Sequence, residues 1–150
     1  LIIEKIGLGN FDSLVSIPTG GLIIGSALAI ETVKPLIYVR NKPKDYGTAK
    51  SIEGKISSDM QVMMIDDIAT TGTSVLNGIK QLKAEGLSIS NACVIINRLE
   101  GADKILNSVG VTLHQLTDIL EITEILFREK LIGEDILEKI KKQVSQNQAS

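Results

Sequence analysis

The stretch from residue 62 to residue 74 constrains the fold more than any other part of the chain. It opens with a fully apolar run, 62–65, of the kind typical of a buried central strand. Two adjacent acids follow, and unpaired carboxylates cannot lie deep in a core. We therefore expect Asp66 and Asp67 at the carboxyl end of a strand, facing a crevice, as ligand-binding residues do in parallel α/β sheets.

A hydroxyl-rich turn and a helix follow the two acids. Thr70, Thr71 and Thr73 can donate hydrogen bonds, and Gly72 can take a positive φ angle. Four apolar residues then recur at helical spacing before Gly86: Val75, Leu76, Ile79 and Leu82. A helix that starts in such a turn offers free backbone N–H groups and the positive end of its dipole, which suit a phosphate. The neighbouring acids suit sugar hydroxyls or a hydrated divalent cation.

This stretch resembles the motif with which type I phosphoribosyltransferases bind 5-phosphoribosyl-1-pyrophosphate (PRPP). The resemblance is specific, because capping a helix does not need two acids, three threonines and a glycine together. A Walker P-loop is excluded, since no Gly-Lys-Ser/Thr follows the turn, and the stretch is not a Rossmann fingerprint. The resemblance implies eight PRPP-binding positions: Asp66, Asp67, Ala69, Thr70, Thr71, Gly72, Thr73 and Ser74.

A second strand, turn and helix precede this motif. Residues 14–17 are expected to form a short strand, and 22–30 read as a buried helix. The turn between them resembles the pyrophosphate-binding loop of the same family. The resemblance implies that the backbone N–H groups of Thr19, Gly20 and Gly21 bind an anion.

Residues 40–58 form a charged segment with few apolar residues, for which we expect a mobile surface loop. Bases outnumber acids there although the whole chain has a net charge of −2, which suggests that an anionic ligand meets this segment. Its Arg-x-x-x-Lys-Asp-x-Gly order resembles the catalytic loop of orotate phosphoribosyltransferase, with Arg40 and Lys44 on matching positions. Asn41 and Tyr46 depart from the usual pattern, a base and a histidine respectively.

The resemblance implies that this loop closes over PRPP across the interface of a homodimer. Arg40, Lys44 and Tyr46 then contact PRPP, and Arg40, Lys44 and Asp67 contribute to catalysis. Because the unperturbed pKa of a tyrosine is about 10, Tyr46 is a poor proton donor or acceptor at neutral pH.

An arginine follows the next expected strand, 90–96. An arginine in such a place can pair bidentately with a planar carboxylate. The segment from Asn97 to Gly101 is similar to the Asp-Arg-x-Glu-Gly segment of orotate phosphoribosyltransferases, with Asn97 in place of the acid. This implies that Arg98 contacts orotate. A surface ion pair between Arg98 and Glu100 or Asp103 remains the alternative.

The rest of the chain gives weaker signals. We expect a short strand at 111–113 with a structural His114 at its end, helices over 116–146 and fraying at 147–150. The lone Cys93 agrees with a core position and with a reducing cytoplasm. No apolar run is long enough to span a membrane, and the net charge gives no reason to expect nucleic-acid binding.

The sequence thus predicts one α/β domain over 1–150, a type I phosphoribosyltransferase-like parallel sheet flanked by helices. The resemblance adds a five-stranded core and an N-terminal hood segment that we expect to precede Leu1. It also implies the transfer of phosphoribose from PRPP to orotate with Mg²⁺. Two alternatives stay open: a PRPP-sensing regulator, and a phosphoribosyltransferase for another nucleobase.

Overall fold

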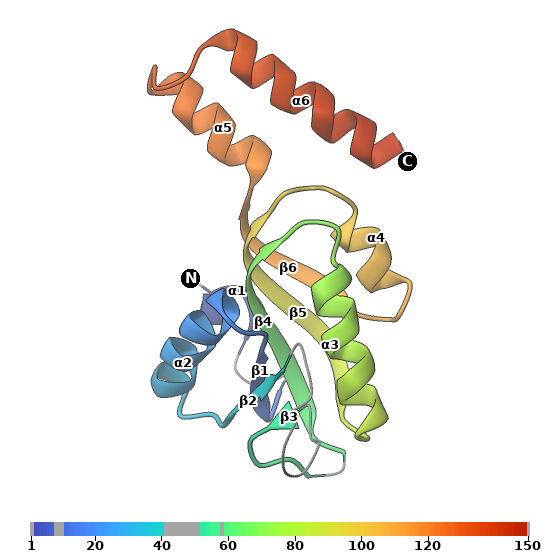
Figure 1. The fold of residues 1–150 in the computed structure, drawn as a ribbon. Helices are drawn as coiled ribbons and strands as arrows, with labels where there is room; N and C mark the ends of the chain where they lie inside the picture. The colour runs from blue at the N-terminus through green and yellow to red at the C-terminus, as the bar shows by residue number, and fades with distance from the viewer. Residues whose placement is uncertain (1, 8–10, 41–51, 58, 150) are drawn as a thin grey trace.

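A six-stranded sheet forms the centre of the structure, a computed structural model that describes residues 2–7, 11–40, 52–57 and 59–149. The strand order is β3-β2-β1-β4-β5-β6 (Figure 1). The strands are β1 (Ser13–Ser16), β2 (Leu36–Val39), β3 (Ile52–Glu53), β4 (Gln61–Ala69), β5 (Ser88–Asn97) and β6 (Thr112–Asp118). Five strands run in parallel and β3 pairs antiparallel with β2 at one edge, so the predicted α/β fold is confirmed.

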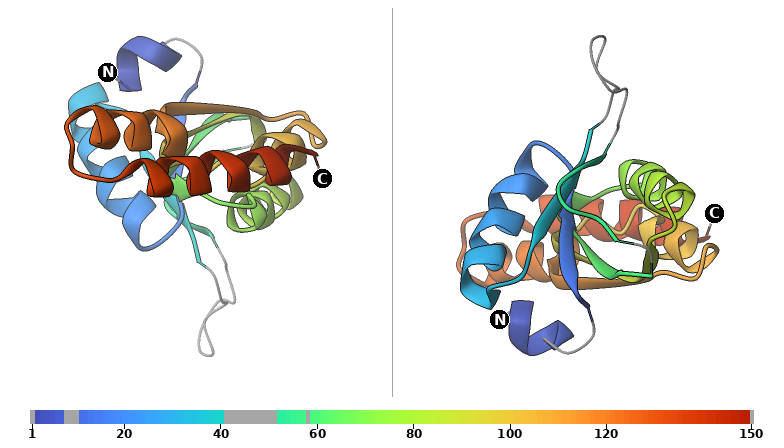
Figure 2. Two further views of the ribbon diagram at one scale, coloured as in Figure 1. Left: turned by 90° about the horizontal axis from the view of Figure 1, so that it is seen from above. Right: turned by 90° about the horizontal axis from the view of Figure 1, so that it is seen from below.

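Helices cover both faces of the sheet. They are α1 (Ile2–Ile6), α2 (Gly20–Thr32), α3 (Thr73–Ala84), α4 (Ala102–Asn107), α5 (Ile119–Arg128) and α6 (Glu134–Ala149). Because side chains alternate along a strand, Leu14 and Met63 enter a core cluster with residues of α1 and α2, while Val15 and Met64 enter one with α3 and α4. Figure 2 shows α5 and α6 lying across the end of this layered body.

The strand order reverses between β1 and β4. The chain leaves β1 through α2 toward β2 on one side, and it leaves β4 through α3 toward β5 on the other side. The two strands are parallel neighbours, with Ser16 opposite Ile65. Their following turns therefore diverge, and such a switch point leaves a crevice at the carboxyl ends of the strands.

Several boundaries differ from the sequence prediction: β1, α2 and β5 shift by one or two residues at their ends, and four differences are larger. Residues 52–53 belong to a strand rather than a loop, and β4 continues through both acids to Ala69. β6 runs to Asp118, so His114 lies within a strand and helix begins at 119 rather than 116. Pairing with the long strand β5 extends β6, and the Asp118 side chain caps α5 by accepting from the N–H of Glu121. α6 continues to Ala149, so residues 147–149 are helical.

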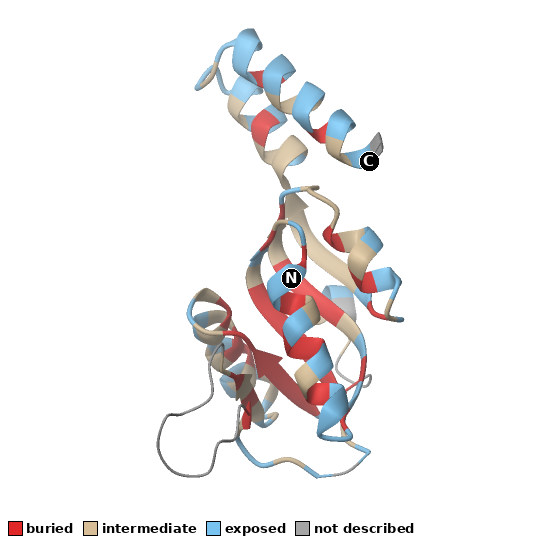
Figure 3. Ribbon diagram, turned by 45° about the vertical axis from the view of Figure 1, so that its right-hand side comes forward, coloured by how far each residue is buried: buried red, intermediate tan, exposed pale blue. Residues whose placement is uncertain are grey.

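Burial is concentrated in the strands, as Figure 3 shows, whereas α5 and α6 leave much of their surface exposed. Cys93 is buried in β5, and burial raises the pKa of its thiol to about 11. A thiol that stays protonated at neutral pH is a poor nucleophile, which supports a core role for this residue. Across the described ranges, no helix is both long enough and apolar enough to cross a membrane.

Candidate functional site

A cavity of about 330 Å³ lies at the switch point between β1 and β4. The turn after β1 and the end of β4 with its following turn supply its walls. The lining residues are Ile17, Pro18, Thr19, Gly20, Asp66, Asp67, Ile68, Ala69, Thr70, Thr71, Gly72, Thr73, Ser74 and Val75. The fold thus brings the two glycine-containing turns, at 18–21 and 70–73 in the sequence, to one site.

The two acids sit at different depths in this cavity. Asp66 is only 8% exposed, whereas Asp67 is half-buried. Burial raises the pKa of the Asp66 carboxyl to about 7, the N–H of Asp67 opposes the shift by donating to Oδ1 at 2.9 Å, and the neighbouring Asp67 carboxylate adds to it. Near neutral pH, Asp66 is therefore present both as an acid that donates and as a carboxylate that accepts.

The turn after β1 approaches both carboxyl groups closely. A Cβ atom added at Gly20 would lie 1.9 Å from Oδ2 of Asp67, and one at Gly21 would lie 2.7 Å from Oδ1 of Asp66. Glycine is needed at both positions because any side chain would overlap an acid. The peptide bond between Pro18 and Thr19 in this turn is cis.

The other end of the cavity suits an anion. α3 starts at Thr73, and the preceding Gly72 has a φ of +80° and would bring a Cβ to 3.0 Å from the Cα of Ala102. The hydroxyls of Thr71 and Thr73 lie 2.9 Å apart. α2 also starts at the cavity, where Thr19 makes no side-chain capping bond. Two helix N-termini and several hydroxyls therefore offer N–H and O–H donors to phosphate groups at separate points of one cavity.

Arg98 lies beside this cavity rather than in it. Its backbone N–H donates to the carbonyl of Ala69 at 2.8 Å, which fixes the turn after β5 against the cavity wall. Its Nη2 lies 2.6 Å from Oε1 of Glu100, so the ion pair raised as an alternative from the sequence is present. Arg98 and Glu100 line a second cavity, of about 200 Å³, with residues of α5 and α6.

The remaining predicted residues lie elsewhere. Arg40, at the end of β2, donates through Nε to Oε1 of Glu53 at 3.0 Å and through Nη2 to the Tyr38 hydroxyl at 3.2 Å. Lys44 and Tyr46, predicted to contact PRPP, lie outside the described residues.

Four apolar lining residues, Ile17, Pro18, Ile68 and Val75, were not among the predicted site residues, although each lies within two positions of one. The donor set fits a hydrated magnesium ion, because Mg²⁺ is usually held by one or two carboxylates, waters and substrate phosphates. Asp66 and Asp67 supply two such carboxylates. Within the described part of the chain, no group of three or more His, Cys, Asp or Glu is placed to enclose a metal ion without a substrate.

The chain resembles known proteins both in sequence and in structure. The family model described as phosphoribosyl transferase domain matches residues 1–124. The orotate phosphoribosyltransferase of Cenarchaeum symbiosum is 43% identical over 139 residues, which are 93% of this chain and 70% of that protein. A crystal structure of orotate phosphoribosyltransferase from Aeropyrum pernix has a TM-score of 0.75 and 34% identity, covering 88% of this chain and 73% of that one. The structure of Leishmania donovani UMP synthase has a TM-score of 0.78 and 26% identity, covering 91% of this chain and 29% of that one.

Proposed function

The chain belongs to the phosphoribosyl transferase family, and we propose that it is an orotate phosphoribosyltransferase. The reaction joins orotate to PRPP and gives orotidine 5′-monophosphate and pyrophosphate, a step of pyrimidine nucleotide synthesis. One observation carries the proposal: two helix N-termini and two adjacent carboxylates line one cavity at the switch point. A ribose that bears phosphate at both ends matches this order of groups.

Each part of the cavity has a role in this reaction. Residues 70–74 hold the 5′-phosphate. The backbone of Thr19 and Gly20, which line the cavity, and of the adjacent Gly21 holds the pyrophosphate. Asp66 and Asp67 hold the ribose hydroxyls. As the bond between C1 of ribose and pyrophosphate breaks, positive charge grows on the ring and negative charge on the leaving group, while a ring nitrogen of the base forms the new bond to C1. The protein therefore acts mainly by positioning and by neutralising charge.

Mg²⁺ and the basic groups complete the proposal. The ion would be held near Asp66 and Asp67 through its water shell and the PRPP oxygens, and it would stabilise the pyrophosphate that leaves. Arg40 and Lys44 would add positive charge on the same side, with Tyr46 contacting PRPP. Arg98 would pair with the carboxylate of orotate through the N–H donors that its contact with Glu100 leaves available.

The decisive experiment is a turnover assay with PRPP and each of orotate, uracil, adenine and guanine. We expect orotidine 5′-monophosphate as the main product, because a cationic guanidinium selects the one base that bears a carboxylate. Added EDTA should stop turnover and excess Mg²⁺ should restore it. Preference for a base without a carboxylate would indicate a different phosphoribosyltransferase, and PRPP binding without any turnover would indicate a PRPP-sensing regulator.

We further propose that residues 1–150 act as one phosphoribosyltransferase unit in a homodimer whose 40–58 loop serves the partner's site. An exposed apolar face of α2 supports this association. Ile23, Ala27 and Ile30 share one side of the helix, and the two isoleucines are 72% and 81% exposed. Such a face on a soluble helix marks an interaction surface.

Mixing two inactive variants tests the dimer and its shared loop together. Lys44→Ala would spoil the loop and leave the cavity intact, and Asp67→Ala would spoil the cavity and leave the loop intact. If the loop acts on the partner's site, half of the randomly formed dimers are hybrids with one complete site, and activity returns to about a quarter of wild type. A mixture no more active than its parents would contradict the shared loop, and sedimentation as a monomer would contradict the dimer.

For the cell, we propose a cytoplasmic location, supported by the lone and buried Cys93. Fractionation that recovers the protein outside the cytoplasm would contradict it.

A further inference from the structure

Asn97, the last residue of β5, is fully buried and sits at the centre of a hydrogen-bond network. Its Oδ1 accepts from the backbone N–H of Leu99 at 2.9 Å. Its Nδ2 donates to Oδ2 of Asp103 at 3.0 Å and to Oε1 of Gln115 at 2.7 Å. The side chain thus makes three hydrogen bonds, which join the turn after β5 to α4 and to the neighbouring strand β6.

The direction of the amide is fixed by partners that allow no choice. The Leu99 N–H can only donate to the side-chain oxygen, and Nδ2 donates to an oxygen of Asp103, so the amide serves as acceptor and donor at once. Gln115 is fixed in the same way, because its Nε2 donates to Oδ2 of Asp118 at 3.1 Å. A carboxylate at 97 would instead face the acceptor oxygens of Asp103 and Gln115.

The network holds the turn that carries Arg98. Leu99 has a φ of +57°, which is unusual for a residue with a branched side chain, and the Asn97 bond to its N–H supports that conformation. Arg98 lies between these two residues. The backbone that carries the Arg98 side chain, and its ion pair with Glu100, therefore belongs to the turn that Asn97 bonds.

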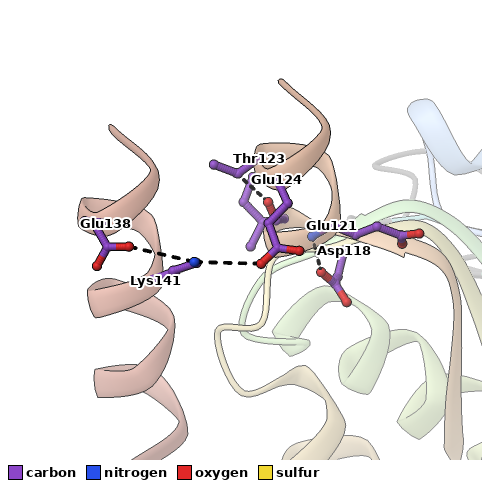
Figure 4. A network of polar contacts seen from close by, with 7 residues as sticks. Asp118, Glu121, Thr123, Glu124, Glu138 and Lys141 are labelled. Atoms are coloured by element: carbon purple, nitrogen blue, oxygen red, sulfur yellow. Dashed lines mark hydrogen bonds and ion pairs between the residues drawn. The ribbon is translucent and has the colours of Figure 1, made fainter. Parts of the chain in front are cut away.

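The same network reaches the start of α5. The other oxygen of Asp118, Oδ1, accepts from the N–H of Glu121 at 2.9 Å, a bond seen in Figure 4. Figure 4 also shows Lys141 of α6 between Glu124 and Glu138, at 3.9 Å and 3.7 Å, which ties the two helices together. These helices complete the second cavity beside Arg98 through Ile119, Ile140, Gln143, Val144 and Asn147. One chain of donors and acceptors therefore runs from the arginine turn to the start of α5, and a separate ion pair joins α5 to α6.

We propose that Asn97 is the positioning residue for base recognition, because it fixes the position of the Arg98 turn relative to the paired helices α5 and α6. The inference rests on the proposed orotate transferase activity for its functional reading. None of the side chains in this network lines the 330 Å³ cavity, whose wall the turn meets through the backbone bond from Arg98 to Ala69, so we expect the larger effect on the base side.

The test compares Asn97→Asp with a control, Asn91→Asp, which makes the same change on the same strand. In the control, a carboxylate oxygen replaces the Asn91 Oδ1 and can keep its contact with His114. In Asn97→Asp we expect KM for orotate to rise about tenfold, because the loss of one hydrogen bond to a charged group costs about that much in binding. KM for PRPP should stay within about twofold of wild type. Asp103→Asn added to Asn97→Asp supplies the missing donor and should recover most of the orotate KM. Asn91→Asp should leave both constants unchanged.

Hydrogen exchange gives a readout that does not need activity. Breaking the Asn97–Gln115 bond should speed exchange of the Glu121 amide about tenfold, 24 residues away in sequence, and Asp103→Asn should partly reverse it. Equal rises in both KM values, or unchanged exchange at Glu121, would overturn the positioning role. A wild-type protein with no orotate turnover would refute the proposed function instead, and exchange at Glu121 would still decide whether Asn97 holds the turn and helices together.

Discussion

Gly20→Ala is expected to weaken PRPP binding about a hundredfold or more while leaving the fold intact. The added methyl would lie 1.9 Å from Oδ2 and 2.4 Å from Cγ of Asp67, so either the turn after β1 or the carboxylate must move. A displacement of about 1 Å among positioned groups is enough to cost about a hundredfold. Calorimetric titration with PRPP and Mg²⁺ should show a loss of affinity of at least that size.

Gly133→Ala is a matched control for that variant. Its added Cβ would meet Oδ1 of Asp135 at 2.4 Å, but this is the end of an exposed side chain that can turn into water. We expect wild-type PRPP affinity there. Wild-type affinity in Gly20→Ala would show that the turn does not pack against Asp67 as described. It would also contradict the proposal that this turn binds the pyrophosphate.

Gly25→Ala is expected to destabilise the fold strongly, far more than a methyl group added at an exposed glycine. The new Cβ would lie 2.0 Å from the Ser16 hydroxyl and 3.2 Å from Cδ1 of Leu36, under the middle of α2. Ser16 is fully buried, and its hydroxyl has no hydrogen-bond partner among the described residues. Overpacking of this kind costs about 3 kcal/mol, measured as the free energy of unfolding in urea.

A double variant separates this contact from a general effect on the helix. Ser16→Ala removes an unpartnered buried hydroxyl and should leave stability unchanged or raise it by up to about 1 kcal/mol. In that background, Gly25→Ala should cost less than about 1 kcal/mol, since the remaining Ser16 Cβ lies 3.2 Å away. Additive losses would show that the clash with Ser16 is not the cause.

The parts of the site that were predicted from the sequence are those whose residues lie next to one another in the chain. The Thr/Gly turn at 70–74 can be recognised as a phosphate-binding turn, because its hydroxyls, its glycine and the following helix all lie within a few positions. The glycines at 20 and 21 were found the same way, although their reason, the close approach of two acids, appears only in three dimensions.

What the sequence left out depends on pairing between distant segments. β3 is two residues long and exists through its bonds to β2, and β6 is extended by its register with β5. Helical spacing from residue 116 misplaced the start of α5, because Asp118 acts both as the end of the strand and as the cap of the helix. In the sequence, Asn97 only departs from the acid of the Asp-Arg-x-Glu-Gly segment. In the structure, its buried surroundings hold an acceptor and a donor partner that suit an amide.

The continuation of β4 beyond its apolar run has a consequence for how PRPP is bound. Asp66 lies opposite Val94 and Ala69 opposite Asn97 in the ladder with β5, so the acids are held by the sheet itself. The ordering of these groups is completed when the chain folds, and little conformational entropy remains to be lost when a ribose arrives. The sugar end of the site is in this sense a rigid template, and adaptation to the ligand has to come from the segments that surround it.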